Sequence, residues 1–107
     1  MTASRLISAA RLLSQEVDGL CFAEPISHTY NPLDYAWAPH EEYLRRFGEG
    51  DKRVIFVGMN PGPFGMVQIG VPFGEIAAAR DWMGISAPVV KPAAETPARP
   101  IEGLSLI

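Results

Sequence analysis

Residues 54–75 read VIFVGMNPGPFGMVQIGVPFGE and place a glycine- and proline-rich loop between an apolar run and a helical pattern. Val54–Val57 is mostly β-branched, which is typical of a strand buried on both faces. Gly58 ends this run, and a helical pattern begins near Glu75. Residues 54–84 therefore predict a strand, a long loop and a helix. In open α/β sheets ligands bind beyond the carboxyl ends of strands, which is where this loop would lie.

Composition sets limits on what the chain can be. Its 107 residues give room for one small domain, and its net charge of −3 carries no overall basic signature for nucleic acid. Cys21 is the single cysteine, which excludes an internal disulfide and a cysteine-ligated metal cluster made by this chain alone. His28 and His40 have no acidic or cysteine partner at ligand spacing, so we expect no metal and no cofactor. No apolar run approaches the ~20 residues that span a membrane, so we expect no membrane partner.

The chain before residue 54 predicts two helices with an irregular segment between them. Within the N-terminal region 1–20, residues 4–20 predict an amphipathic helix, capped by Thr2 or Ser4. Its expected apolar stripe comprises Leu6, Ala10, Leu13, Val17 and Leu20. Prolines predict an irregular segment over 21–39, and residues 40–47 predict a short helix with Pro39 in its first turn. The aromatic residues Tyr30, Tyr35 and Trp37 predict local packing, with stacking on bases as the alternative.

The pattern after the loop indicates an incomplete domain. Residues 75–83 predict a helix with Gly84 just past its end, and residues 85–107 predict a proline-rich irregular tail. A lone strand of the buried type has no partners for its hydrogen-bonding ladder. The sequence therefore predicts the first half of one α/β domain, ending within a loop at Ile107.

The residues of the loop allow a structural and a functional interpretation. It lacks the Gly-Lys-Ser/Thr ending of a Walker motif, and Pro61 and Pro63 remove two backbone donors, so a nucleotide-phosphate site ranks last. Asn60 before a proline is common at turn starts, but its amide can also hold a water molecule. Phe73 is either a core residue or a loop aromatic that stacks on a planar base. Glu75 is most simply a carboxylate in the first turn of the following helix.

The loop also carries a resemblance to a known family. The run Gly58–Met66, followed by Gly70–Glu75, resembles the first active-site motif of the single-strand-selective monofunctional uracil-DNA glycosylases. Further similarity lies upstream at 31–37 and 39–40, and downstream at 81–82, 91–92, 97, 99–100 and 103–104. The similarity covers residues 25–104 and corresponds to an N-terminal portion of that family.

The resemblance implies a three-layer α/β/α fold and excision of uracil and C5-oxidised uracils from DNA. It implies base flipping, then hydrolysis of the N-glycosidic bond by water. Asn60 matches the asparagine that orients this water, and Phe73 matches the aromatic residue that stacks on the uracil. The other expected substrate-binding residues are Met59, Gly62, Pro63, Phe64, Gly65 and Met66, of which residues 62–66 match the segment near the C5 edge.

One family motif is missing from this chain. The family has a later motif similar to His-Pro-Ser-Pro-Arg-Asn, whose histidine stabilises the uracil anion, and neither His28 nor His40 lies in such a motif. We therefore expect uracil-containing DNA, single- or double-stranded, and a missing C-terminal half as partners. The alternative is an inactive remnant or fragment with at most weak nucleic-acid binding. The expected location is the nucleoid of a bacterium or the nucleus of a eukaryote.

Overall fold

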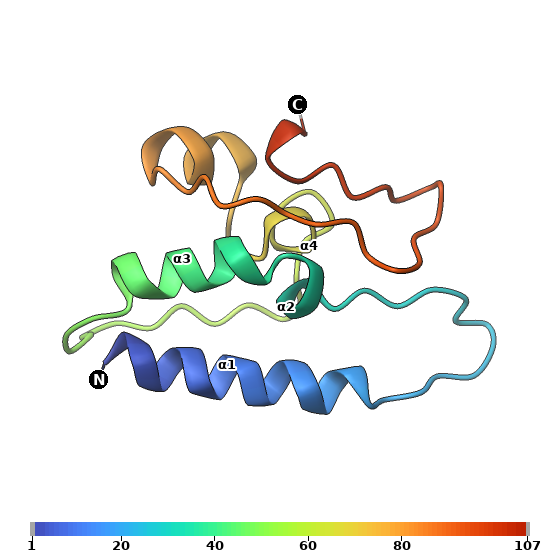
Figure 1. Ribbon diagram of the computed structural model, residues 1–107, viewed down its shortest axis with the longest axis horizontal. Coiled ribbons are helices and arrows are strands. Elements are labelled where there is room, and N and C mark those ends of the chain that lie inside the picture. Colours follow the sequence, from blue (N-terminus) through green and yellow to red (C-terminus); the bar gives the residue numbers. More distant parts are fainter. Residues whose placement is uncertain (1, 107) are drawn as a thin grey trace.

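The structure is a computed structural model that describes residues 2–106. Its helices are α1 (Ala3–Asp18), α2 (Pro32–Tyr35), α3 (Trp37–Phe47) and α4 (Met66–Ile69), followed by the π-helical turn η1 (Ala78–Trp82) and the 3₁₀ turn η2 (Gly103–Ser105). Residues 2–106 contain no β-strand. In Figure 1, α1 and α3 lie side by side, and the C-terminal chain crosses the other side of α2 and α3. No helix among the described residues is long and apolar enough to cross a membrane.

Helix α1 confirms the predicted N-terminal helix but not its predicted buried stripe. The Thr2 side chain accepts a hydrogen bond of 3.4 Å from the Arg5 amide, as expected of an N-cap. Leu13 and Leu20, however, are 49% and 58% exposed, whereas Ala3 and Ser14 are buried. The expectation of a buried stripe was wrong, since the packing of α1 against α2 and α3 leaves Leu13 and Leu20 largely in solvent.

The segment predicted to be irregular over 21–39 contains α2 and the start of α3. Asn31 caps α2, since its Oδ1 accepts a hydrogen bond of 3.1 Å from the Leu33 amide, and Pro32 occupies the first turn. The Asn31 amide nitrogen also donates to Asp18 at the end of α1, over 2.8 Å. Asparagine followed by proline was therefore a helix start in this chain and not a break.

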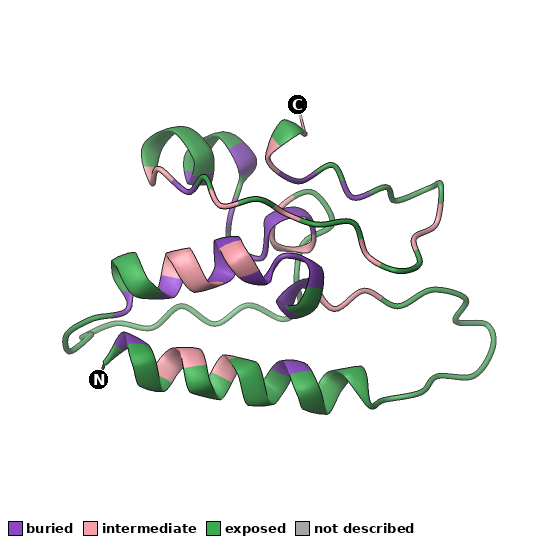
Figure 2. Ribbon diagram, viewed as in Figure 1, coloured by how far each residue is buried: buried purple, intermediate pink, exposed green. Residues whose placement is uncertain are grey.

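The core lies between the α2–α3 layer and the C-terminal half of the chain. Figure 2 shows buried residues on α3, α2 and α4, at the start of the η1 turn and in the tail. One cluster comprises Ile69, Val71, Ile76, Ala79 and Ile85, and a second comprises Tyr35, Ala36 and Ile101. The tail 85–106 is irregular apart from η2, as predicted, but Ile85 and Ile101 are fully or almost fully buried. The aromatic packing expected at residues 30–37 is also present, because Tyr35 and Trp37 are buried.

The main difference from the sequence prediction is that the expected strand over residues 54–57 is not formed. Val54–Val57 is extended but unpaired, and these four residues are 70–84% exposed. A strand of the buried type needs neighbours on both edges and both faces, and no other strand exists among the described residues. The described residues alone therefore form helices and packed irregular chain, without the sheet of an α/β domain.

Candidate active site

The two ends of the glycine-rich segment meet at Phe73. A Cβ atom placed on Gly58 would lie 3.2 Å from Cζ of Phe73, so this ring rests against the backbone two residues before Asn60. The Phe56 ring meets the Phe73 ring edge to face, with 6.5 Å between the ring centroids. Phe73 also has a φ of 55°, which is an uncommon conformation for a residue with a side chain. The fold thus holds the Phe73 ring against the Gly58 backbone at some conformational cost.

The loop between Asn60 and Phe73 is folded back by a close backbone contact. A Cβ atom on Gly65 would lie 3.0 Å from the Gly74 carbonyl oxygen, so only glycine allows this approach without a shift. The Gly62 carbonyl accepts hydrogen bonds from the amides of Gly65 and Val67, over 3.2 and 3.0 Å. These bonds form the turn that leads into α4. Residues 62–66 consequently lie next to the backbone that carries Phe73.

The side chains expected to bind substrate are largely open to solvent. Asn60 is exposed, and its amide nitrogen donates a hydrogen bond of 3.1 Å to the carbonyl of Pro61. Met59, Phe64 and Phe73 are 96%, 63% and 70% exposed. Gly62 and Pro63 are exposed too, while Gly65 and Met66 are half-buried. The side chains of Met59, Asn60, Phe64 and Phe73 are therefore exposed and do not enclose a base.

Two contacts from the tail hold this loop, and sequence analysis missed both. The buried Gln68 of α4 accepts hydrogen bonds from the amides of Glu102 and Gly103, over 2.8 and 3.1 Å, and donates to the Pro100 carbonyl. Arg99 lies over the Phe64 ring, 5.6 Å from its centroid. A lone amide within the apolar run 66–69 was the only sequence signal for the first contact.

The helix after the loop confirms the predicted role of Glu75. Its carboxylate accepts hydrogen bonds from the amides of Ala77 and Ala78 and so caps this helix. Ile76 and Ala77 form the first turn, and the remaining turn is π-helical, closed by a hydrogen bond from the Met83 amide to the Ala78 carbonyl. Gly84 has a φ of 75° just past the end, as predicted for a C′ glycine.

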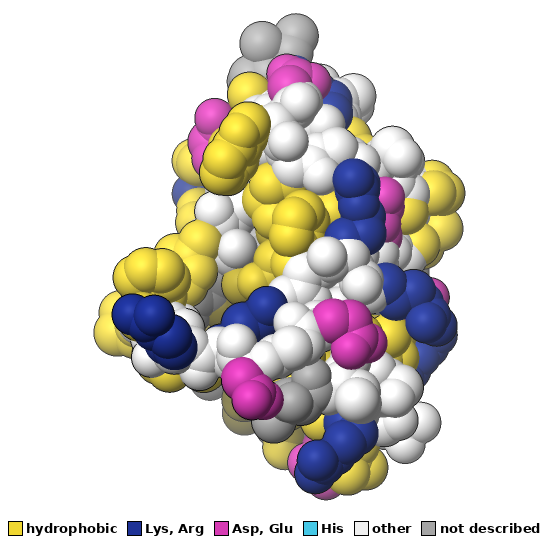
Figure 3. All heavy atoms as spheres, turned by 90° about the vertical axis from the view of Figure 1, so that its left-hand side faces the viewer, with side chains coloured by type: hydrophobic (Ala, Val, Ile, Leu, Met, Phe, Trp, Pro, Cys, Tyr) yellow, Lys and Arg dark blue, Asp and Glu magenta, His cyan; other side chains and the backbone are white. Residues whose placement is uncertain are grey.

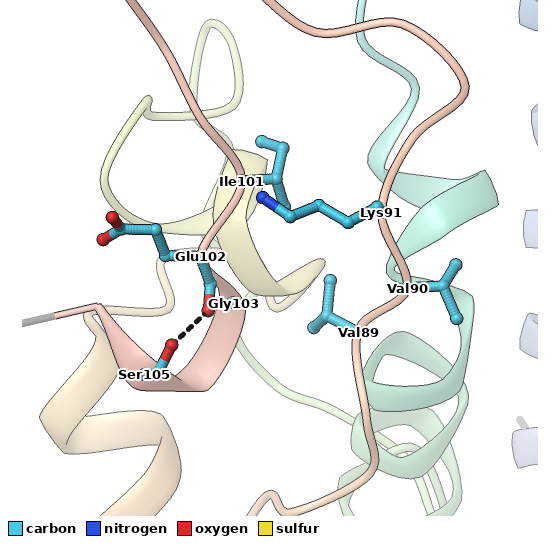
Figure 4. A pocket seen from close by; sticks show the side chains of 7 residues that line it. All are labelled: Val89, Val90, Lys91, Ile101, Glu102, Gly103 and Ser105. Atoms are coloured by element: carbon cyan, nitrogen blue, oxygen red, sulfur yellow. Dashed lines mark hydrogen bonds between the residues drawn. The ribbon is translucent and has the colours of Figure 1, made fainter. Parts of the chain in front are cut away.

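A cavity in the tail lies apart from this loop. It has a volume of about 560 Å³ and is lined by Val89, Val90, Lys91, Ile101, Glu102, Gly103 and Ser105 (Figure 4). The Ser105 hydroxyl is occupied by a hydrogen bond of 2.6 Å to the Glu102 carbonyl. None of the predicted site residues lines this cavity. Among the described residues, no group of three or more histidine, cysteine or acidic side chains could hold a metal ion.

Comparison with known proteins gives the loop a context. The chain is 54% identical over 92 residues to the single-strand selective monofunctional uracil-DNA glycosylases of Mus musculus and Rattus norvegicus, and 52% identical over 92 residues to that of Bos taurus. The predicted resemblance to the single-strand-selective monofunctional uracil-DNA glycosylases is confirmed. The matched region is 86% of this chain but only 33–34% of each of these glycosylases, so the chain spans about a third of their length. No family model matches the chain.

Proposed function

We propose that this chain carries the first active-site motif of an enzyme that hydrolyses the N-glycosidic bond of uracil, and of C5-oxidised uracils, in DNA. The observation that carries the proposal is the 54% identity, over 86% of the chain, to proteins named as uracil-DNA glycosylases. A three-layer α/β/α fold belongs to this proposal, with Val54–Val57 paired inside its sheet. In the cell the enzyme would lie with DNA, in a nucleoid or a nucleus.

The chemistry of the loop agrees with this proposal. Hydrolysis of the glycosidic bond leaves a uracil anion and a sugar with cationic character, so donors aimed at the base lower the barrier. The backbone amides of Gly58, Met59 and Asn60 donate no hydrogen bond within residues 2–106 and are available to a ligand. The Asn60 amide would orient the attacking water, and Phe73 would stack on the flipped base. Leaving-group stabilisation must carry more of the barrier, because a neutral amide is no general base.

The test is excision of uracil from single-stranded DNA, detected as strand cleavage after alkali. The 107-residue chain is assayed alone and together with the segment of the Mus musculus relative that follows the matched region. We expect activity in the combined sample and its loss in Asn60→Ala. Because the Asn60 side chain is exposed and contacts only the Pro61 carbonyl, this substitution should leave thermal unfolding unchanged. Full activity of Asn60→Ala would contradict the role of this residue.

The alternative is an inactive remnant of the same family. The observation that favours it is the open surface around Asn60 and Phe73, which encloses no base. No excision in either sample, with a chain that unfolds cooperatively, would support the remnant and contradict the proposed activity.

A further inference from the structure

We propose that Arg99, which lies over the Phe64 ring, binds a phosphate of the DNA strand whose base enters the loop between Asn60 and Phe73. This inference rests on the proposed function and adds to it a residue that positions the substrate. The guanidinium carbon of Arg99 lies 5.6 Å from the centroid of the Phe64 ring, and both side chains are exposed. Stacking on an aromatic face leaves the N–H donors of a guanidinium group at its edge, where phosphate oxygens can approach them.

A turn anchored by Tyr30 fixes the place of Arg99 in the tail. The Arg99 amide donates a hydrogen bond of 2.9 Å to the Thr96 carbonyl, across a turn that contains Pro97. The Tyr30 hydroxyl donates to the Arg99 carbonyl over 2.9 Å and accepts from the Thr96 amide over 2.8 Å. The Tyr30 ring packs edge to face against the buried Tyr35, with 6.3 Å between the ring centroids. Arg99 is therefore held at its backbone by the core, so less freedom is lost when its side chain binds a ligand.

The charge of Arg99 is not balanced by a carboxylate in the part of the chain that the structure describes. Arg45 pairs with Glu41 over 3.1 Å, whereas no ion pair joins Arg99 to a described acidic side chain. Its Nη1 donates to the Ala98 carbonyl over 3.2 Å, which leaves the other N–H donors for a ligand. Residues 54–74 carry no charge, so the loop itself offers a phosphate no cation. An arginine held against this loop supplies one.

The path from Arg99 to the base site runs through Phe64. Phe64 precedes Gly65, which approaches the Gly74 carbonyl closely, and Gly74 directly follows Phe73. In the proposed function Phe73 stacks on the flipped base, so the strand that carries this base passes this part of the loop with a negative charge on each nucleotide. At the end of the molecule on the left of Figure 1, Lys and Arg side chains are scattered among hydrophobic and acidic ones and form no continuous basic face (Figure 3). Single contacts such as that of Arg99 therefore matter for binding.

The salt dependence of binding to single-stranded DNA tests this contact. The probe is a fluorescently labelled oligonucleotide without uracil, and anisotropy gives the affinity of the 107-residue chain between about 50 and 200 mM salt. In Arg99→Gln, the slope of log affinity against log salt should be shallower by about 0.7, the value for one phosphate of a single strand. Arg99→Lys keeps the charge and should keep the slope.

Arg45→Gln is the matched control, because it removes the same charge from an exposed arginine that pairs with Glu41. It should leave the slope unchanged. Equal slopes in the wild type and Arg99→Gln, the same decrease in Arg45→Gln, or no binding by the wild-type chain would each overturn the proposal.

A double-mutant cycle tests whether Tyr30 positions Arg99. Tyr30→Phe keeps the ring and removes the hydroxyl that joins Thr96 to Arg99. It should weaken DNA binding in the wild-type background and much less in the Arg99→Gln background, because the two residues act as a unit. Equal weakening in both backgrounds would contradict the positioning role of Tyr30.

The DNA-binding result and the excision result are read separately. A slope that depends on Arg99, with no uracil excision in the combined sample, would support the phosphate contact and contradict the proposed activity. Excision in the combined sample, with an unchanged slope in Arg99→Gln, would support the proposed activity and overturn the phosphate contact.

Discussion

The Nδ1 atom of His40 donates a hydrogen bond of 2.8 Å to the carbonyl oxygen of Gly70 and so joins α3 to the end of α4. The His40 side chain is buried, and its ring lies 5.7 Å from the Trp37 ring and 6.4 Å from the Tyr43 ring, measured between centroids. Burial lowers the pKa of His40 below its ordinary value of 6.5, and the bond to the carbonyl opposes this shift only in part. A buried neutral histidine thus supports the layer on which the glycine-rich loop rests.

Stability should fall in mild acid because of His40. Its pKa is lower in the folded chain, so the unfolded chain binds the proton first as the pH drops. Neutral His40 makes its full contribution to the free energy of unfolding well above pH 6.5, the ordinary pKa. This contribution is lost as the pH falls toward the pKa of the folded chain. Urea unfolding at pH 7.5 and 5.5 should show this loss, and His40→Asn, which keeps a donor near the Nδ1 position, should show less of it. His28→Asn is the exposed control, and an unchanged pH dependence in His40→Asn would contradict the prediction.

Gly70→Ala should destabilise the chain more than Gly50→Ala. Both glycines have positive φ, 74° and 82°, so both substitutions bear the cost of a left-handed residue, about 1–2 kcal/mol. A Cβ on Gly70 would also lie 2.6 Å from the Ala36 carbonyl oxygen, whereas nothing lies within 4 Å at Gly50. We expect Gly70→Ala to cost ~1–3 kcal/mol beyond Gly50→Ala in urea unfolding. Equal losses would show that the contact with Ala36 relaxes freely.

Removing the Gln68 amide should release the tail from the loop. Gln68→Leu leaves the partly buried amide of Glu102 and the buried amide of Gly103 without an acceptor, at an expected cost of about 1–3 kcal/mol in unfolding free energy. Gln68→Glu keeps an acceptor oxygen and loses the donor to Pro100. Hydrogen exchange at the two amides should therefore accelerate in Gln68→Leu and much less in Gln68→Glu. The same exchange rates in both variants would indicate that the tail is held by its apolar contacts alone.

Substitutions at Phe73 should distinguish the role of its aromatic ring from the strain of its backbone. Under the proposed function, Phe73→Ala should lower uracil excision by the combined sample at least about fivefold, since stacking on a base is worth ~1–3 kcal/mol. Phe73→Tyr keeps the aromatic face and should retain activity. Phe73→Gly also lacks the ring but relieves the φ of 55°, so it should be as inactive as Phe73→Ala and more stable to urea. Wild-type excision by Phe73→Ala would contradict the stacking role.

Local patterns predicted the local features of this chain. The helix at the N-terminus, the helix start at Glu75 and the glycine just past the end at Gly84 depend on neighbours within one or two turns, and all three are present. The same kind of reasoning does not predict α2, because prolines predict breaks over 21–39, whereas Asn31 and Pro32 form a helix start. It also missed Gln68, whose partners lie more than thirty residues away at 102 and 103.

The residues between Val54 and Glu75, and their spacing, are enough to indicate the family resemblance without any structure. Three features became visible only in the folded chain: Gly65 approaches Gly74, Phe73 contacts Gly58, and Val54–Val57 is exposed and forms no ladder. The physical reason is that a strand becomes buried only when distant segments supply its partners. An apolar run predicts a buried strand, but contacts with remote parts of the chain determine whether the run is paired and buried.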